Sequence, residues 1–227
     1  MKLGDRLKQV ISLVPVSQSM ADIGTDHGYI PLSLLEENKV RKAIACDINH
    51  GPLERAKEHI FQEGKSHDVE IRLGSGLEPV SDGEVDGVVI AGMGGLMILQ
   101  ILEDCLEKAK HLHWLVLQPQ NHTAELKQYL SSHGFKIEKE ELALEGGHLY
   151  EMFRAVPGKM NELSYLDAEI GCTEDYRNHP LFYRHLKKLI KKRNDLIQGI
   201  AEDTDNKRNY LRRQNALKEK KILEAFL

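Results

Sequence analysis

The residues Ala-Asp-Ile-Gly-Thr-Asp-His-Gly-Tyr at positions 21–29 decide the fold of this chain. Apolar side chains at 20, 21 and 23 predict a buried strand, Gly24 interrupts it, and apolar residues at 30, 32, 34 and 35 predict a helix. A strand, a glycine-containing turn and a helix N-terminus let backbone N–H groups approach a cofactor. Asp47 ends the next apolar run, and a carboxylate roughly twenty residues beyond the glycine turn can bind ribose hydroxyls.

The turn carries acidic residues that a pyrophosphate site would avoid. It is not the dinucleotide pattern G-x-G-x-x-G, because Asp26 stands where the second glycine would be. Asp26 would repel a pyrophosphate and attract a cation, and Asp22 adds a second acid. With Asp47, these groups suit S-adenosylmethionine, which has an ammonium, a sulfonium and a ribose. The alternative is an ordinary strand–helix turn with Asp26 as the helix N-cap.

Composition indicates a globular protein with no membrane contact. The chain has 227 residues, 41% hydrophobic and 29% charged, and its apolar runs are too short to span a bilayer. Residues 1–10 lack a signal-peptide core, so we expect a cytoplasmic protein. The three cysteines lack C-x-x-C spacing, so we expect buried thiols, no disulfide framework and no metal site. No feature indicates an obligate protein partner.

Charge divides the chain at Pro157-Gly158. The formal net charge is −8 over residues 1–157 and +4 over residues 158–227. We therefore predict a cofactor-binding domain at 1–157 and a basic helical hairpin at 158–227. A basic block on an acidic protein favours a polyanionic partner. The alternatives are a solvated coiled-coil face and a dimerisation arm.

Hydrophobic periodicity predicts an α/β fold. Helices are expected at 2–14, 29–37, 52–63 (with Pro52 at the first helical position), up to about 107, and 123–133. Strands are expected at 19–24, 42–47, 69–73, 86–91, 114–117, 135–144 and 148–156. This order implies a mostly parallel Rossmann-like sheet with an antiparallel hairpin at one edge.

The C-terminal part should form an antiparallel, coiled-coil-like helical hairpin with its basic residues facing outward. Residues 167–180 are polar and predict a loop or a short helix. Residues 203–206, Asp-Thr-Asp-Asn, predict the break between the two long helices and the N-cap of the second.

The glycines after the fourth strand bear on the methyl acceptor. Enzymes that methylate an exocyclic amine usually have an Asn/Asp-Pro-Pro-aromatic motif there, whereas this chain has Ala-Gly-Met-Gly-Gly at 91–95. No side chain accepts amine hydrogens, so an acceptor nitrogen with a free lone pair fits better. Adenine N1 is such a nitrogen. We hypothesise that the glycines let a flat base approach the backbone.

Several short sequence motifs resemble those of a known family. They are residues 21–31, Asp47-Ile48-Asn49, Gly-Ser-Gly-Leu at 74–77, Ala-Gly-Met-Gly-Gly at 91–95 and Leu-Gln-Pro-Gln-Asn at 117–121. Together they look like the bacterial tRNA (adenine-N1) methyltransferases of the TrmK type, which modify adenine 22 in the D-arm. The resemblance covers nearly the whole chain. It implies S-adenosylmethionine as cofactor and tRNA as partner, bound by the C-terminal hairpin.

The resemblance assigns site residues by position. Those expected around the cofactor are Asp22, Gly24, Thr25, Asp26, His27, Gly28, Asp47, Ile48, Gly74, Ser75, Gly76 and Gly92. Those expected at the reacting atoms are Asp26, His27, Gly92 and Met93. Those expected to contact tRNA are Tyr29, Gly94, Gln118, Asn121, Lys188, Lys192, Arg193 and Arg212.

The sequence leaves the roles of several of these residues open. His27 either bonds locally or faces the substrate, and N1 methylation requires no general base beforehand. Tyr29, Tyr150 and Phe153 are candidates to stack on a flipped adenine, although aromatic residues in strands usually belong to the core. Gln118 and Asn121 either contact the base or ribose or cap the next helix. The competing functions are a nicotinamide-dependent oxidoreductase, a methyltransferase of another RNA and a non-catalytic RNA-binding factor.

Overall fold

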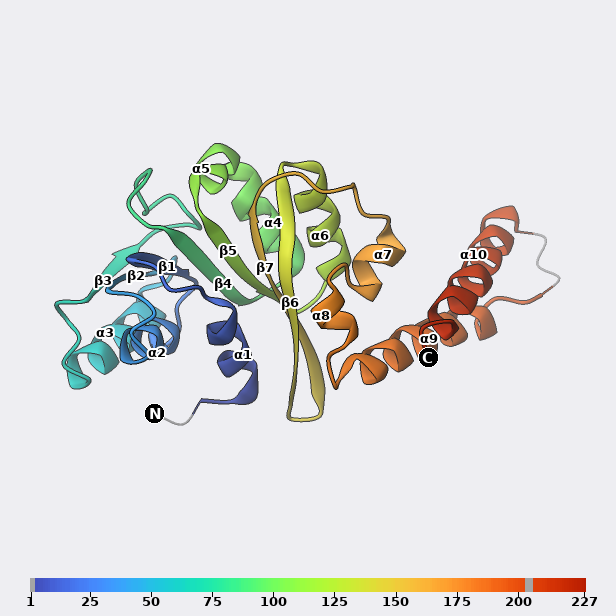
Figure 1. Ribbon diagram of the computed structural model, residues 1–227, viewed down its shortest axis with the longest axis horizontal. Helices are drawn as coiled ribbons and strands as arrows, with labels where there is room; N and C mark the ends of the chain where they lie inside the picture. The colour runs from blue at the N-terminus through green and yellow to red at the C-terminus, as the bar shows by residue number, and fades with distance from the viewer. Residues whose placement is uncertain (1–2, 203–205) are drawn as a thin grey trace.

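A computed structural model describes residues 3–202 and 206–227 of the chain (Figure 1). Within them, seven strands form one sheet in the order β3-β2-β1-β4-β5-β7-β6. The strands are β1 (Ser19–Ile23), β2 (Lys42–Asp47), β3 (Val69–Leu73), β4 (Gly87–Met93), β5 (Trp114–Pro119), β6 (Phe135–Glu145) and β7 (His148–Pro157). β1 to β5 are parallel, and β7 runs antiparallel to both β5 and β6. The predicted sheet, including its antiparallel edge, is confirmed.

Helices cover both faces of the sheet because alternate strand residues face opposite sides. α1 (Asp5–Leu13), α2 (Tyr29–Glu36) and α3 (His50–Gln62) pack on one face, against Met20, Ala45 and Val89. α4 (Gly95–Asp104), α5 (Leu106–His111) and α6 (Thr123–Ser132) pack on the other, against Ile23 and Ile90. Because these strands are parallel, the carboxyl ends of β1, β2, β4 and β5 lie at one edge of the sheet, and the strand order reverses between β1 and β4.

Several predicted boundaries needed correction. α3 begins at His50, so Pro52 is its third residue and not its first. β4 continues through Gly92 to Met93, because pairing with β5 carries the strand past its apolar run. The helix expected to reach residue 107 ends at Asp104, and α5 follows. All three cysteines are free thiols, but only Cys46 is fully buried.

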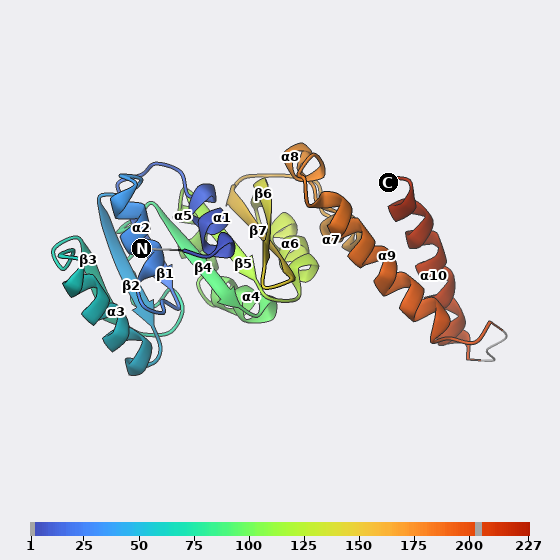
Figure 2. The ribbon, with the colours of Figure 1, turned by 90° about the horizontal axis from the view of Figure 1, so that it is seen from below.

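The C-terminal hairpin consists of α9 (Phe182–Gln198) and α10 (Lys207–Glu224), which extend away from the sheet (Figure 2). Asn206 caps α10, and its side-chain oxygen accepts from the N–H groups of Arg208 and Asn209. The rest of the predicted break, residues 203–205, lies outside the described residues. Among the described residues, no helix is long and apolar enough to cross a membrane.

The segment before the hairpin packs on the sheet domain and is helical in part. It contains α7 (Tyr165–Ile170) and α8 (Glu174–Arg177). A fully buried ion pair, Lys127 Nζ to Glu140 Oε1 at 2.6 Å, anchors it, because the other Glu140 oxygen accepts from the N–H groups of Cys172 and Thr173 at 2.8 and 2.7 Å. Burial by itself would lower the pKa of Lys127, but the Glu140 carboxylate raises it above its ordinary value. Residues 158–181 are therefore held to the sheet by buried contacts.

Candidate active site

The turn after β1 exposes backbone at the sheet edge. The N–H groups of Gly24 and Thr25 both donate to the Cys46 carbonyl at 2.8 Å, which fixes the turn to the end of β2. Gly24 has φ +79°, and a side chain there would overlap Met93 Cε. Gly28 has φ +65° and caps α2, where a Cβ would press against α3. Both positions require glycine because L-residues rarely adopt this conformation.

A cavity of about 200 Å³ beside this turn contains a buried carboxyl group. Asp22 is 4% exposed, and burial raises its pKa from 3.8 to about 7. The Thr25 side chain opposes this rise in part, and the charge of Asp47 adds to it. No basic side chain in residues 3–202 or 206–227 forms an ion pair with it. A buried carboxylate without a counter-ion is stabilised by a cationic ligand.

Arg6 on α1 lines the same cavity and was not found by sequence reasoning. Its Nη1 donates to Gln118 Oε1 at 2.7 Å, and the same oxygen accepts from the Gly92 N–H at 3.1 Å. The guanidinium also lies 5.8 Å from the centre of the Tyr150 ring. In the sequence, Arg6 looks like an ordinary polar position of an amphipathic helix. Only the tertiary structure brings it to the cavity.

The ends of β2 and β3 form the part of the edge predicted for ribose and adenine. Asp47 Oδ1 accepts from the Asn49 N–H at 2.7 Å, and its carbonyl accepts from the Gly74 N–H at 3.0 Å. The two turns therefore lie side by side. Ile48 is 64% exposed next to Asp47, which leaves an apolar surface at the expected position. The structure brings together the predicted residues of this part: Asp47, Ile48, Gly74, Ser75 and Gly76.

Asp26, His27 and Tyr29 form the outer wall of the turn. Asp26 is largely exposed, its Oδ1 lies 2.9 Å from Arg55 Nη2 and 3.6 Å from His27 Nε2, and Arg55 partly compensates its charge. His27 has φ +65° and stacks on Tyr29 at 5.3 Å between ring centres. Its carbonyl accepts from His59 Nδ1 at 2.7 Å. Asp22 is thus the buried acid of the site, and Asp26 is the solvated one.

The glycines at 92, 94 and 95, which we call the glycine shelf, lie in and directly after a bulge at the end of β4. Gly92 has φ +82° where the pairing with β5 shifts register, a position that glycine favours. Asn121 accepts from the Gly95 N–H with both its carbonyl and its Oδ1, each at 3.1 Å. Asn121 therefore fixes the start of α4, and not of the next helix. A Cβ on Gly94 would lie 3.3 Å from Asn121 Oδ1, and one on Gly95 would overlap the Asn121 carbonyl, so these two positions have little room for a side chain.

Gln118 and Phe153 lie inside the protein, which overturns the predicted contact for Gln118 and assigns Phe153 to the core, where strand aromatics usually lie. Gln118 is fully buried, and its oxygen and amide are both engaged, the amide donating to the Pro119 carbonyl at 2.9 Å. It holds Gly92 and cannot reach a base. Phe153 is also fully buried and belongs to the core.

The hairpin presents most of its predicted cations to solvent. Lys188, Lys192 and Arg212 are exposed. Arg193 is 5% exposed and pairs with Glu169 and Glu219, so the expectation that it faces outward is wrong. It joins α7, α9 and α10, because burying a guanidinium requires acidic partners.

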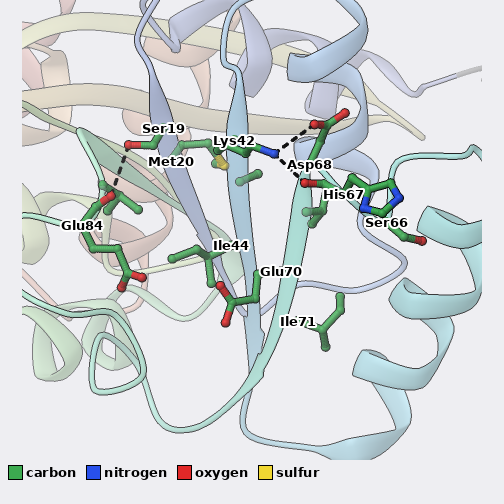
Figure 3. A pocket seen from close by; sticks show the side chains of 13 residues that line it. Ser19, Met20, Lys42, Ile44, Ser66, His67, Asp68, Glu70, Ile71 and Glu84 are labelled. Atoms are coloured by element: carbon green, nitrogen blue, oxygen red, sulfur yellow. Dashed lines mark hydrogen bonds and ion pairs between the residues drawn. The ribbon is translucent and has the colours of Figure 1, made fainter.

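A further hollow of about 460 Å³ lies at the opposite end of the strands (Figure 3). It is lined by the first residues of β1, β2 and β3, including Ser19 and Lys42, and Lys42 pairs with Asp68 at 3.3 Å. Ligands of open parallel sheets bind at the carboxyl ends, so this hollow is separate from the candidate site.

Comparison with known proteins agrees with this geometry. A family model described as a methyltransferase domain matches residues 3–153. The tRNA (adenine(22)-N(1))-methyltransferase of Bacillus subtilis is 36% identical over 158 residues, which are 70% of this chain and 66% of that protein. A Streptococcus pneumoniae structure, described as a tRNA (m1A22) methyltransferase in complex with S-adenosyl-L-methionine, is 30% identical with a TM-score of 0.85 over 100% of both chains. Mycoplasma capricolum TrmK with S-adenosyl-homocysteine is 29% identical with a TM-score of 0.84 over 100% of both chains.

The fold and the site define a Rossmann-like methyltransferase. The cofactor of this class is S-adenosylmethionine, and the unpaired Asp22, the positive-φ glycines and Asp47 fit it. Within the class, the chain belongs to the bacterial tRNA (adenine-N1) methyltransferase family of the TrmK type.

Proposed function

We propose that this protein transfers the methyl group of S-adenosylmethionine to N1 of an adenine in tRNA, at position 22, in the cytoplasm. The observation that carries this proposal is a cavity with a buried, unpaired acid at a sheet edge that ends in a shelf of glycines. The acid matches a cationic methyl donor, and the shelf matches a flat acceptor. The relatives described above act on tRNA by their names, and the exposed cations of the hairpin suit that polyanion.

The cavity suits the amino-acid end of the cofactor. Asp22 would bind the ammonium and Arg6, on another wall of the same cavity, the carboxylate. Asp47 would bind the ribose hydroxyls, while Ile48 and the turn at 74–76 would flank the adenine. When bound, the cofactor supplies a sulfonium-activated methyl group, and the protein mainly has to align donor and acceptor.

The shelf explains the choice of acceptor atom. Adenine N1 attacks with its own lone pair, so the protein needs no general base at Gly92–Gly94. Gln118 and Asn121 fix the backbone on both sides of the shelf, by hydrogen bonds to Gly92 and Gly95. The ring becomes cationic as the N1–methyl bond forms, and carboxylates at the edge stabilise that charge. His27, stacked on Tyr29, would help to form the wall of the base site.

We also propose that the two parts of the chain have different roles. Residues 1–157 form the methyltransferase domain, and residues 158–227 form the tRNA-binding part. Residues 158–181 are held to the sheet domain, so α9 and α10 would form the contacts with tRNA. Lys188, Lys192 and Arg212 lie there in exposed positions.

The deciding experiment is to incubate unmodified tRNA with isotope-labelled S-adenosylmethionine and to map the modified nucleoside. We expect 1-methyladenosine at position 22, and none when that adenine is replaced by guanine. Label at another nucleotide would favour a methyltransferase of different specificity. Tight tRNA binding without cofactor binding would favour a non-catalytic RNA-binding factor.

A further inference from the structure

Two adjoining hollows connect the glycine shelf with the hairpin. The first, of about 470 Å³, lies between the loop Gln120–Thr123 and the α9 residues Lys188 and Lys192. The second, of about 310 Å³, lies between α7, α9 and α10 and reaches Arg212. Both volumes fall in the range of about 300–1,000 Å³ typical of small-molecule sites. Asn121 lines the first hollow and accepts from the Gly95 N–H, so this hollow borders the loop that holds the glycines of the candidate active site.

Tyr165 stands where the two hollows meet, since it lines both. It is the first residue of α7, which lies between α6 and the hairpin (Figures 1 and 2), and 39% of the residue is exposed. The ammonium of Lys192 is 5.8 Å from the centre of its ring. A partly exposed aromatic ring therefore lies where the two hollows meet, with a cation over one of its faces.

Tyr165 is held rigidly. Ser164 caps α7 through its hydroxyl, which accepts from the Asp167 N–H at 3.1 Å. At the other end of α7, Glu169 pairs with Arg193 and, at 2.9 Å, with Lys192. Tyr165 therefore has a fixed position relative to both α6 and α9, as a stacking surface requires.

The charges along the path formed by the two hollows favour a nucleic-acid strand. Four acids line the path, and each has a partner. Glu169 and Glu219 pair with Arg193, Glu125 Oε1 lies 2.9 Å from His122 Nδ1, and Glu151 accepts from the Tyr176 hydroxyl at 3.3 Å. The most exposed charged groups of the path are the cations Lys188, Lys192 and Arg212, and Lys188 has no acidic partner within residues 3–202 and 206–227. Single strands bind where aromatic rings stack on bases and cations contact phosphates.

We propose that Tyr165 is a nucleobase-stacking platform, and that the path from Asn121 over Tyr165 to Arg212 binds a strand of the tRNA next to the methylated adenine. This rests on the proposed function and assigns it a base-binding site outside the catalytic cavity. The path would guide the strand from the hairpin to the shelf, so that the exposed adenine reaches the cofactor without disturbing the contacts of its neighbours.

The test compares tRNA affinity among single variants of the full chain. Tyr165→Ala should weaken binding of unmodified tRNA about tenfold, the order expected for one stacked base. Tyr165→Phe should bind normally, because the ring is retained. The matched control is Phe61→Ala, which removes an exposed aromatic ring on α3 that lines neither hollow and lies outside the hairpin. This control should bind tRNA normally.

Two readouts separate stacking from other effects. Tyr165→Ala should leave S-adenosylmethionine affinity and the salt dependence of tRNA binding unchanged, whereas Lys188→Ala should reduce the salt slope by about one. Ultraviolet cross-linking of the wild-type protein to tRNA should label the peptide containing Tyr165, without relying on any variant.

Clear outcomes would overturn the inference. They are a Tyr165→Ala variant that binds tRNA within twofold of wild type, a Tyr165→Phe variant as weak as Tyr165→Ala, or cross-links confined to α9 and α10. If the wild-type enzyme methylates adenine N1 but any of these occurs, the stacking site is wrong and the proposed function stands. If the wild-type protein methylates no tRNA, the proposed function itself fails.

Discussion

Replacing Asp22 by asparagine should stabilise the protein without its cofactor at high pH. Burial raises the pKa of this carboxyl from 3.8 to about 7, so the folded state disfavours its ionised form. A shift of about 3 units corresponds to about 4 kcal/mol. Because the raised pKa belongs to the folded state, the contribution of protonated Asp22 to stability is complete below about pH 4 and is lost as the pH rises to about 7.

The assay is denaturant unfolding of wild type and Asp22→Asn at two pH values. The variant should be more stable than wild type by about 4 kcal/mol at pH 8, but by only about 2 kcal/mol at pH 5. Asp82→Asn, which changes an exposed acid, should show no such pH dependence. An equal difference at both pH values, or none at pH 8, would show that Asp22 is not an uncompensated buried acid.

The same carboxyl predicts the pH dependence of cofactor binding. If Asp22 must ionise to bind the ammonium, S-adenosylmethionine should bind wild type more weakly by about 30-fold at pH 5.5 than at pH 8, with release of a proton. Asp22→Asn should bind the cofactor poorly at every pH. Calorimetry in buffers of different ionisation enthalpy would detect the proton, and its absence would contradict this assignment.

Three further predictions follow from specific contacts. Lys127→Met should lower the free energy of unfolding by about 3–5 kcal/mol, because it leaves the buried Glu140 carboxylate without its ion-pair partner. The double variant with Glu140→Gln should recover much of the lost free energy, as measured by denaturant unfolding. Arg6→Ala should lower kcat/KM for methyl transfer at least tenfold, as expected for losing a hydrogen bond from a charged group, whereas Lys8→Ala on the same helix should have no effect in the same assay. Gly24→Ala should abolish cofactor binding, measured by calorimetry, since L-residues rarely adopt the positive φ of this turn; normal affinity would contradict this.

The sequence by itself determined the order of the strands and helices and the chemical type of the site, although not every element boundary. β2 and β3 have their predicted bounds, and the sheet has the predicted parallel core and antiparallel edge. These features depend on local periodicity and on where a strand becomes a turn, which neighbouring residues control. For the same reason, the order of residues along the chain was enough to assign Gly24, Asp22 and Asp47 to one edge of the sheet.

Only the tertiary structure decided which distant residues meet. Arg6 reaches Gln118 across 112 positions, and no local pattern distinguishes it from a solvated arginine. Hydrophobic periodicity gave the stripe of α9 but not the inward position of Arg193, because that depends on acids from α7 and α10. Likewise, only the packing of α7 between α6 and α9 places Tyr165 where the two hollows meet. The positions of these side chains depend on how separate helices and strands pack against one another. The order of residues within any one helix or strand does not specify that packing.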